Sequence, residues 1–182
     1  AIKSIIDKHS PSLFINFAAE THVDNSIESS YEFIKTNVLG TQVLLDLFRE
    51  YLSNLPNSSL RKFIQISTDE VYGDLQKNDL PFTENSQYSP KNPYAASKNA
   101  IEYIPHINSV GMRFHTVYGP VPRANMFFDK LLNNKLEYVT NHKRDFIHIE
   151  DLCEAIEVIM DSKFNGSLDV GTGYSVRIQD IR

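Results

Sequence analysis

Tyr94 and Lys98 are the two side chains whose types and spacing are best suited to moving a proton. They stand four positions apart in the run Tyr-Ala-Ala-Ser-Lys, so a helix would place them on one face. A nearby ammonium group favours tyrosinate and lowers the pKa of a tyrosine from its ordinary value of about 10. Tyr94 could then take the proton of a substrate hydroxyl. The alternative is a tyrosine on a helix surface beside a lysine, which the spacing alone does not exclude.

A second polar group, Ser67-Thr68-Asp69-Glu70, comes directly after an apolar run of strand length. A hydroxyl and two adjacent carboxylates at the end of a buried strand are costly to desolvate unless they are used. The alternative is an acidic turn with a capping serine. Together with Tyr94, the group predicts acid–base chemistry at this strand end.

Short apolar runs alternate along the chain with segments of helical periodicity, which predicts an α/β fold with a parallel sheet and crossover helices. The expected strands are residues 13–18, 63–67, 110–115, 137–139 and 167–170, and the expected helices are residues 1–9, 25–52, 93–104, 127–132 and 149–160. Ligands bind outside the carboxyl ends of the strands in such sheets. The segments directly after the strands are therefore predicted to form the site, namely residues 18–21, 67–72 and 115–120.

Composition and charge exclude several kinds of partner. The 182 residues carry 18 basic and 23 acidic side chains, a net charge of −5, which provides no positive field for nucleic acid or an anionic membrane. No apolar run approaches the roughly 20 residues that span a bilayer. No spacing of His, Cys and carboxylates indicates a metal site. Cys153, the only cysteine, excludes an intrachain disulfide and favours a reducing compartment such as the cytoplasm.

Seven motifs along the chain carry a resemblance to a known family. They are Phe-Ala-Ala-Glu-Thr-His-Val-Asp-Asn-Ser-Ile at 17–27, Thr-Asn-Val-Leu-Gly-Thr at 36–41, Ser-Thr-Asp-Glu-Val-Tyr-Gly at 67–73, Pro-Tyr-Ala-Ala-Ser-Lys at 93–98, Val-Tyr-Gly-Pro at 117–120, Arg-Asp-Phe-Ile-His-Ile-Glu-Asp at 144–151 and Asp-Val-Gly-Thr-Gly at 169–173. In this order they resemble the extended short-chain dehydrogenase/reductases, the NAD-dependent epimerase/dehydratase family, and most of all its dTDP-glucose 4,6-dehydratases. The resemblance implies a Rossmann-like fold.

The resemblance also implies a mechanism in which NAD is a recycled hydride carrier. Tyr94 would take the proton of the sugar 4-hydroxyl, Lys98 would tune Tyr94 and hold the nicotinamide ribose, and Thr68 would hydrogen-bond the 4-oxygen. Glu70 would remove the proton at the 5-position, and Asp69 would protonate the departing 6-hydroxyl. The expected product is a 4-keto-6-deoxy sugar.

Binding roles follow from the same resemblance. The residues expected to contact NAD are Phe17, Ala18, Ala19, Glu20, Thr21, Thr36, Ser67, Tyr94 and Lys98. Those expected to contact the nucleotide-diphosphate sugar are Thr21, His22, Thr68, Thr116 and Arg144. Arg144 would pair with the diphosphate, a task suited to a planar bidentate cation. Residues 1–120 are expected to be a partial NAD-binding domain with the catalytic residues, and residues 121–182 part of a substrate-binding region with a returning strand.

The sequence departs from the family pattern in three places. The Gly-rich turn that holds the cofactor pyrophosphate is absent, so the chain alone is expected to bind NAD poorly. Thr116 and Val117 stand where the dehydratases usually carry two asparagines, and this version resembles nucleotide-sugar epimerases. Only 14 residues separate Lys98 from Arg113, with Pro105 among them, which leaves less helix than the family's homodimer interface commonly uses.

The ends of the chain also bear on its function. Residues 1–9 have the pattern of the end of a helix, without an initial Met, and residues 178–182 have that of the start of another. The expectation is therefore a fragment, truncated at the N-terminus, of a 4,6-dehydratase acting on a dTDP- or UDP-hexose. A nucleotide-sugar 4-epimerase is the nearest alternative. An inactive remnant or binding module without the phosphate loop is the alternative from another class.

Overall fold

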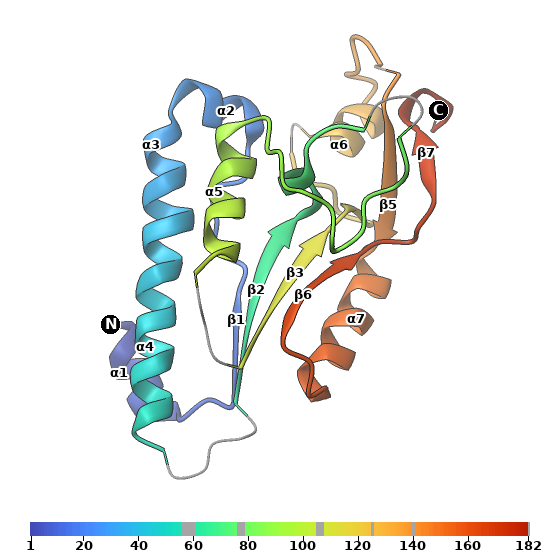
Figure 1. Cartoon of the computed structure of the whole chain (residues 1–182). Coiled ribbons are helices and arrows are strands. Elements are labelled where there is room, and N and C mark those ends of the chain that lie inside the picture. Colours follow the sequence, from blue (N-terminus) through green and yellow to red (C-terminus); the bar gives the residue numbers. More distant parts are fainter. Residues whose placement is uncertain (56–60, 76–78, 105–107, 125, 140, 182) are drawn as a thin grey trace. The chain divides into compact units, whose positions relative to one another are not determined.

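A computed structural model describes residues 1–55, 61–75, 79–104, 108–124, 126–139 and 141–181 (Figure 1). The chain divides into two compact units. The first contains Ala1–Arg113 and Phe164–Leu168, and the second contains Phe114–Lys163 and Asp169–Arg182. Among the described residues, no helix has the length and apolar character needed to cross a membrane.

The sheet of the first unit is built around a fully buried strand. Its strands are β1 (Leu13–Asn16), β2 (Lys62–Thr68), β3 (Ser109–Phe114) and β6 (Gly166–Val170), in the order β1-β2-β3-β6, and the last residues of β3 and β6 belong to the second unit. Strands β1 and β2 pair in parallel, with Leu13 opposite Lys62. All seven residues of β2 are buried, as expected for a strand covered on both faces. The predicted parallel sheet with crossover helices is confirmed.

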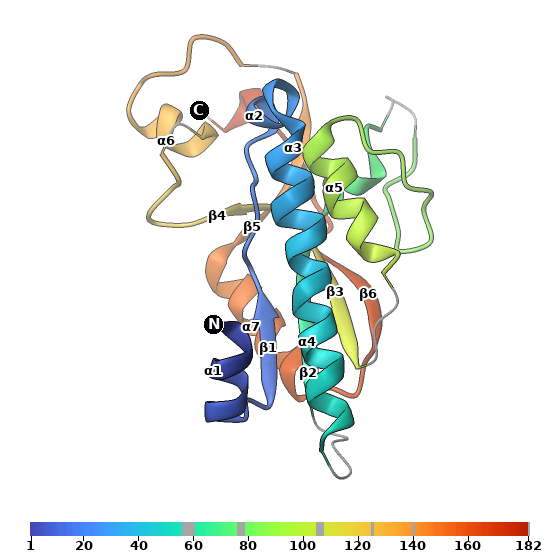
Figure 2. The ribbon, with the colours of Figure 1, turned by 90° about the vertical axis from the view of Figure 1, so that its left-hand side faces the viewer.

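The helices of the first unit include one long, interrupted rod. They are α1 (Ile2–His9), α2 (Val23–Glu28), α3 (Ser30–Phe33), the π-helical segment η1 (Ile34–Gly40), α4 (Thr41–Ser53), the 3₁₀ turn η2 (Asp69–Tyr72) and α5 (Pro93–Glu102). Figure 2 shows α3 and α4 as parts of one rod that lies beside α5. The helix predicted at 25–52 is confirmed in type, but Ser29, with φ −145° and ψ 83°, breaks it. Its middle also winds as a π-helix, which the apolar period did not predict.

An aromatic cluster packs the rod against the sheet. Leu45 and Phe48 of α4 and Phe63 of β2 form a buried core cluster, against which Phe14 of β1 packs. The rings of Phe14 and Phe48 lie edge to face with centroids 4.9 Å apart, a favourable arrangement for an aromatic pair. Phe14 and Phe63 are the second residues of their strands, so this core packs the amino-terminal ends of β1 and β2, and the predicted site residues follow the opposite ends.

The second unit contains a small mixed sheet. Strand β4 (Thr116–Tyr118) runs parallel to β5 (Lys143–His148), which pairs antiparallel with β7 (Ser175–Arg177). Helices α6 (Phe127–Leu132) and α7 (Ile149–Asp161) and the 3₁₀ turn η3 (Ile178–Asp180) complete it. The helices predicted at 127–132 and 149–160 are confirmed.

Three predictions of secondary structure were wrong or incomplete. No strand forms at residues 137–139, where Tyr138 is 77% exposed and the run is too short to bury a face. Strands β4 and β7 were not predicted, because a strand of three residues carries almost no periodic signal. The helix start predicted at 178–182 is a 3₁₀ turn over its described residues. Pro105 and residue 182 lie outside the described residues.

Candidate active site

Helix α5 carries Tyr94 and Lys98 into the interior of the first unit. Pro93 occupies the first helical position, and the side-chain oxygen of Asn92 caps the helix by accepting a hydrogen bond from the Ala95 N–H at 2.7 Å. Tyr94 is 9% exposed and Lys98 is 3% exposed. The alternative interpretation of a surface pair is therefore excluded.

The ammonium group of Lys98 is bonded to the central strand. Its Nζ donates to the carbonyl oxygen of Ile66 in β2 at 2.7 Å. Burial lowers the pKa of Lys98 to about 8, and the nearby charge of Glu102 partly offsets this by raising it. Strongly shifted pKa values cluster at functional sites, so this lysine is a candidate for one.

The acidic run forms a tight turn at the end of β2. Thr68 caps the 3₁₀ turn by accepting a hydrogen bond from the Glu70 N–H at 3.3 Å, and its hydroxyl lies 3.4 Å from the Asp69 carboxylate. The Glu70 carboxylate accepts a hydrogen bond from the side-chain amide of Asn92 at 3.1 Å. Asn92 therefore ties the acidic turn to the first turn of the helix that bears Tyr94. Sequence reasoning missed Asn92, although an asparagine directly before Pro93 is a recognisable capping signal.

The segment after β1 is held beside α5 by Asn37, which is 1% exposed in η1. The Asn37 side chain accepts from the Glu20 N–H at 2.8 Å and donates to the Glu20 carbonyl at 3.0 Å and to the Ser97 hydroxyl at 2.8 Å. The Ser97 hydroxyl in turn donates to the Tyr94 carbonyl at 2.7 Å. Residues 17–21, predicted to line the cofactor, are thus joined to the helix of Tyr94. Asn37 and Ser97 lie within the quoted motifs, but neither was selected as a site residue.

A buried network of side-chain amides joins the segment after β1 to strand β2. The Asn16 side chain accepts from the Ala18 N–H at 3.2 Å and donates to Gln65 at 2.9 Å. The Gln65 amide donates to the Ile66 carbonyl at 2.9 Å, the same oxygen that receives Lys98. Satisfied buried networks of this kind fix side chains in a single arrangement.

The remaining predicted residues of the first unit differ in exposure. Phe17 is 58% exposed, Ala18 and Glu20 are exposed, and Ala19, Thr21, His22 and Thr36 are half-buried. Nδ1 of His22 is buried and has no hydrogen-bond partner among the described residues. A buried polar atom of this kind commonly pairs with a ligand or water. Ser67 is buried and its hydroxyl already donates to Glu102 at 2.6 Å, so that hydroxyl is engaged by protein.

Thr116 and Arg144 belong to the second unit, while the other predicted site residues lie in the first. Thr116 is half-buried and pairs with Phe146 in the register of β4 and β5, and Arg144 is exposed on β5. Beside it, the Asp145 carboxylate accepts hydrogen bonds from the Thr172 hydroxyl at 2.6 Å and the Gly173 N–H at 2.8 Å. This carboxylate therefore holds the turn at 171–173.

Gly171 is required by close packing within the same turn. A Cβ at this position would lie 2.6 Å from the Asp145 carboxylate and 2.6 Å from the His115 ring. The His115 ring therefore packs against this turn, directly after the end of β3. Among the described residues of both units, no group of three or more His, Cys, Asp or Glu side chains is arranged to hold a metal ion.

Comparison with known proteins gives consistent matches over the whole chain. The family model described as GDP-mannose 4,6 dehydratase matches residues 1–182. A dTDP-glucose 4,6-dehydratase of Xanthomonas campestris pv. campestris is 36% identical over 181 residues, which cover 87% of this chain and 50% of that protein. A dTDP-D-glucose 4,6-dehydratase of Dictyostelium discoideum is 30% identical over 99% of this chain and 45% of its own length.

Solved structures give the same result. The crystal structure of dTDP-glucose 4,6-dehydratase from Bacillus anthracis in complex with NAD matches with a TM-score of 0.82 and 28% identity. That match covers 98% of this chain and 57% of the crystallised one. It confirms the Rossmann-like fold predicted from the sequence. The chain spans about half the length of the curated dehydratases that it matches.

Proposed function

The chain belongs to the GDP-mannose 4,6 dehydratase family, within the NAD-dependent epimerases and dehydratases, and we propose that the protein carrying it is a nucleotide-sugar 4,6-dehydratase. The proposed substrate is a dTDP- or UDP-hexose, and the proposed cofactor is NAD. One observation carries the proposal: Asn92 bonds the Glu70 carboxylate and also caps the helix of Tyr94 and Lys98. The acid–base turn and the oxidising pair are thus held together.

The residues after β1 fit the nicotinamide half of a dinucleotide. Asn37 fixes the backbone of Glu20 beside α5, so this segment and Lys98 can line one binding surface. An ammonium group has three N–H donors, and Lys98 uses one of them to bond the Ile66 carbonyl oxygen. Its other N–H donors could bond the hydroxyls of the ribose. Bound NAD would supply a hydride acceptor for oxidation and a hydride donor for the later reduction.

The proposed reaction starts at C4 of the sugar. Tyr94 takes the proton of the 4-hydroxyl while the C4 hydride leaves, and the charge of Lys98 favours the tyrosinate form that this step needs. The Thr68 hydroxyl lies at the carboxyl end of β2 and would hydrogen-bond the 4-oxygen. The product of this step is a 4-ketone, which acidifies the proton at C5.

Elimination of water follows at the acidic turn. Glu70 takes the C5 proton, and the electrons of that C–H bond form a double bond between C5 and C6. The C6–O bond breaks, and Asp69 protonates the leaving hydroxyl so that it departs as water. With the hydride that bound NAD would supply at C6 and a proton at C5, the product would be a 4-keto-6-deoxy sugar. The asparagine that contacts Glu70 keeps this base next to the oxidising helix.

The substrate would be bound through single cations, since the net charge of the chain is −5. We assign the diphosphate to Arg144, which is exposed on β5, and a further polar contact to Thr116 on β4. Thr21 and His22, whose buried Nδ1 has no hydrogen-bond partner within the described part of the chain, are assigned to the sugar. A cytoplasmic location is proposed as well, because Cys153 is a free thiol and NAD-dependent sugar chemistry uses a cytoplasmic cofactor.

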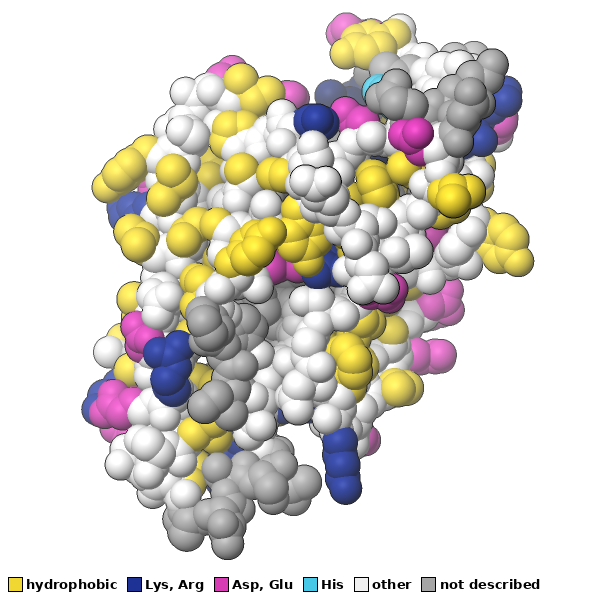
Figure 3. Space-filling view, viewed as in Figure 1, with side chains coloured by type: hydrophobic (Ala, Val, Ile, Leu, Met, Phe, Trp, Pro, Cys, Tyr) yellow, Lys and Arg dark blue, Asp and Glu magenta, His cyan; other side chains and the backbone are white. Residues whose placement is uncertain are grey.

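A homodimer is part of the proposal. Exposed apolar side chains line the outer side of the long rod, namely Ile27, Tyr31, Ile34, Leu39 and Val43. Figure 3 shows hydrophobic side chains gathered over α2 and α3. Exposed apolar side chains that recur along neighbouring helices are a candidate subunit contact. Sedimentation of the protein that carries the chain would test the dimer.

Product analysis separates dehydration from the alternative. The motif around Thr116 and Val117 favours a 4-epimerase, which needs Tyr94 and Lys98 but no acid–base pair. The enzyme is incubated with NAD and dTDP-glucose, and in parallel with UDP-glucose. A 4-keto-6-deoxy product that absorbs in strong base is expected. A galactose-configured nucleotide sugar as the only product would refute the dehydratase and support the epimerase.

A further inference from the structure

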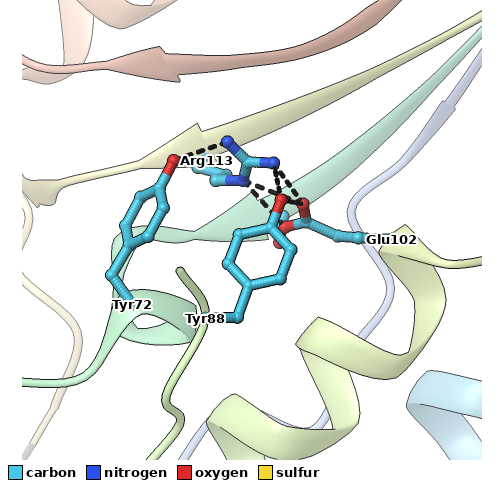
Figure 4. A network of polar contacts seen from close by, with 5 residues as sticks. Tyr72, Tyr88, Glu102 and Arg113 are labelled. Carbon is cyan, nitrogen blue, oxygen red and sulfur yellow. Dashed lines mark hydrogen bonds and ion pairs between the residues drawn. The ribbon is translucent and has the colours of Figure 1, made fainter. Parts of the chain in front are cut away.

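A buried ion pair lies directly beside the acidic turn. Glu102 at the end of α5 and Arg113 in β3 have side chains that are 4% and 2% exposed. The Arg113 Nε donates to both carboxylate oxygens of Glu102, at 3.1 and 2.8 Å, and Nη2 donates to one of them at 2.6 Å (Figure 4). Both shorter bonds go to the same carboxylate oxygen, and hydrogen bonds between charged groups of this kind are shorter and stronger than those between neutral groups.

The pair contacts both ends of the segment that bears Asp69 and Glu70. At the first end, the Ser67 hydroxyl donates to Glu102 at 2.6 Å. At the other end, Nη1 of Arg113 donates to the Tyr72 hydroxyl at 2.6 Å. Figure 4 shows the Tyr72 hydroxyl pointing at the guanidinium from the turn below. The acidic turn is therefore anchored on the same ion pair before and after its two carboxylates.

Aromatic rings close the pair off from water. The guanidinium carbon lies 5.2 Å from the Tyr72 ring centroid and 5.0 Å from that of Tyr88, and Phe82 stacks on Tyr72. The Tyr88 hydroxyl also donates to Glu102 at 2.9 Å. Burial and the charge of Glu102 raise the pKa of Tyr88 to about 12, so its hydroxyl stays protonated and remains a donor.

Arg113 stays charged in this enclosure. Burial lowers the pKa of Arg113, but the hydrogen bond and charge of Glu102 outweigh burial and leave the pKa above its ordinary value. Replacing a buried ion pair by apolar groups of similar volume commonly leaves a protein as stable or more stable. Stability alone therefore does not require this pair, and a role in geometry accounts for it better.

We propose that Arg113 and Glu102 are positioning residues for the elimination step, which hold Glu70 and Asp69 at the C5 and C6 atoms through Tyr72 and Ser67. This inference rests on the proposed dehydratase function. Oxidation at C4 uses Tyr94 and Lys98 on α5, a helix that Asn92 caps and that the Lys98–Ile66 bond joins to β2, together with the Thr68 hydroxyl. Loosening the turn should thus slow elimination far more than oxidation, because a small displacement of an acid or base is costly to the rate.

Two variants of the NAD-bound enzyme test this role. Tyr72→Phe keeps the ring packing and removes only the hydroxyl that Arg113 holds. The double variant Glu102→Gln/Arg113→Met removes both charges, so no unpaired charge is left buried. Phe48→Leu is the matched control, since Phe48 is buried in the core cluster of α4 and touches none of these groups. Stopped-flow absorbance of reduced nicotinamide measures both phases. The absorbance rises as C4 is oxidised, and it falls as elimination and hydride return proceed, so the rate of the rise reports oxidation and the rate of the fall reports the later steps.

The expected result is a split between these two phases. For Tyr72→Phe, the rise keeps the wild-type rate within about twofold and the fall slows about tenfold, the usual effect of a lost hydrogen bond to a charged group. For the double variant the fall slows about 100-fold. The rise also changes, but by less, because Glu102 lies on α5 and its charge raises the pKa of Lys98. For Phe48→Leu both rates per folded enzyme stay at the wild-type value.

Two other outcomes distinguish failure of the positioning role from failure of the proposed dehydratase function. If the wild type forms the 4-keto-6-deoxy product and the fall keeps its rate in both variants, or if rise and fall slow equally, the positioning role is refuted and the dehydratase stands. If the wild type forms no such product, the proposed function fails, and the positioning role fails with it.

Discussion

Glu70 carries the proposed elimination, because it is the carboxylate that must take the C5 proton. We predict that Glu70→Gln abolishes formation of the 4-keto-6-deoxy product and spares oxidation at C4. The expected loss is about 10²- to 10⁴-fold, the usual contribution of a positioned base. Glutamine keeps the size and the contact to Asn92. Single-turnover absorbance of reduced nicotinamide measures both steps, with the exposed Glu154→Gln of α7 as control. Loss of oxidation in Glu70→Gln would contradict the assigned role.

The buried ammonium group of Lys98 should make the free energy of unfolding depend on pH. Burial lowers its pKa from 10.5 to about 8, so between these pH values the unfolded chain binds more protons than the folded one. The free energy of unfolding should therefore gain roughly 3 kcal/mol from this group as pH rises through that window. Lys98→Met should lack this gain, whereas Lys8→Met, changed at an exposed lysine of α1, should keep it. Urea unfolding across the window measures the difference, and equal slopes for wild type and Lys98→Met would argue against the burial of this ammonium.

At the scale of elements, Asn92 joins the acidic turn to α5, and two substitutions separate its two contacts. Asn92→Asp keeps the capping oxygen but faces Glu70 with a second carboxylate, so we expect near wild-type stability and slow elimination. Asn92→Ala loses the cap as well and should cost about 1 kcal/mol of unfolding free energy. Thermal unfolding and product formation are measured on both. Full dehydratase activity in Asn92→Asp would show that this junction is not needed.

The π-helical segment η1 presents Asn37 to the loop after β1, and this too can be tested. Asn37→Ala leaves the Glu20 backbone and the Ser97 hydroxyl without their partner, so a loss of about 1–3 kcal/mol is expected. NAD binding should weaken in parallel, because the same loop is assigned to the cofactor. Urea unfolding and NAD titration measure the two effects, with the exposed Asn25→Ala of α2 as control. Unchanged NAD affinity would remove residues 17–21 from the cofactor site.

The sequence predicted the elements with strong local signals and missed those set by long-range contacts. Helix α5 followed from Pro93 and the run after it, and β2 from its apolar residues. The π-helix did not, because Asn37 turns inward to reach Glu20, 17 residues earlier. Strands β4 and β7 exist only through pairing with β5. The Arg113–Glu102 pair was also missed, since a cation and an acid 11 positions apart carry no local pattern.

At the scale of the whole molecule, the chain holds the proposed catalytic residues but spans about half the length of the dehydratases that it resembles. Its 182 residues include no Gly-rich phosphate turn after a strand. The proposed activity is therefore a property of the protein that carries the chain, and the tests of function apply to that protein with NAD. The net charge of −5 likewise places phosphate recognition on single residues such as Arg144.

Isotope incorporation during turnover tests the dehydratase most directly. The enzyme converts dTDP-glucose in heavy water, and mass spectrometry with NMR identifies the product. We predict a sugar that has lost one water and carries one deuterium at C5, because Glu70 removes that proton and solvent replaces it. A product of unchanged composition, inverted at C4 and free of deuterium at C5, would contradict the account.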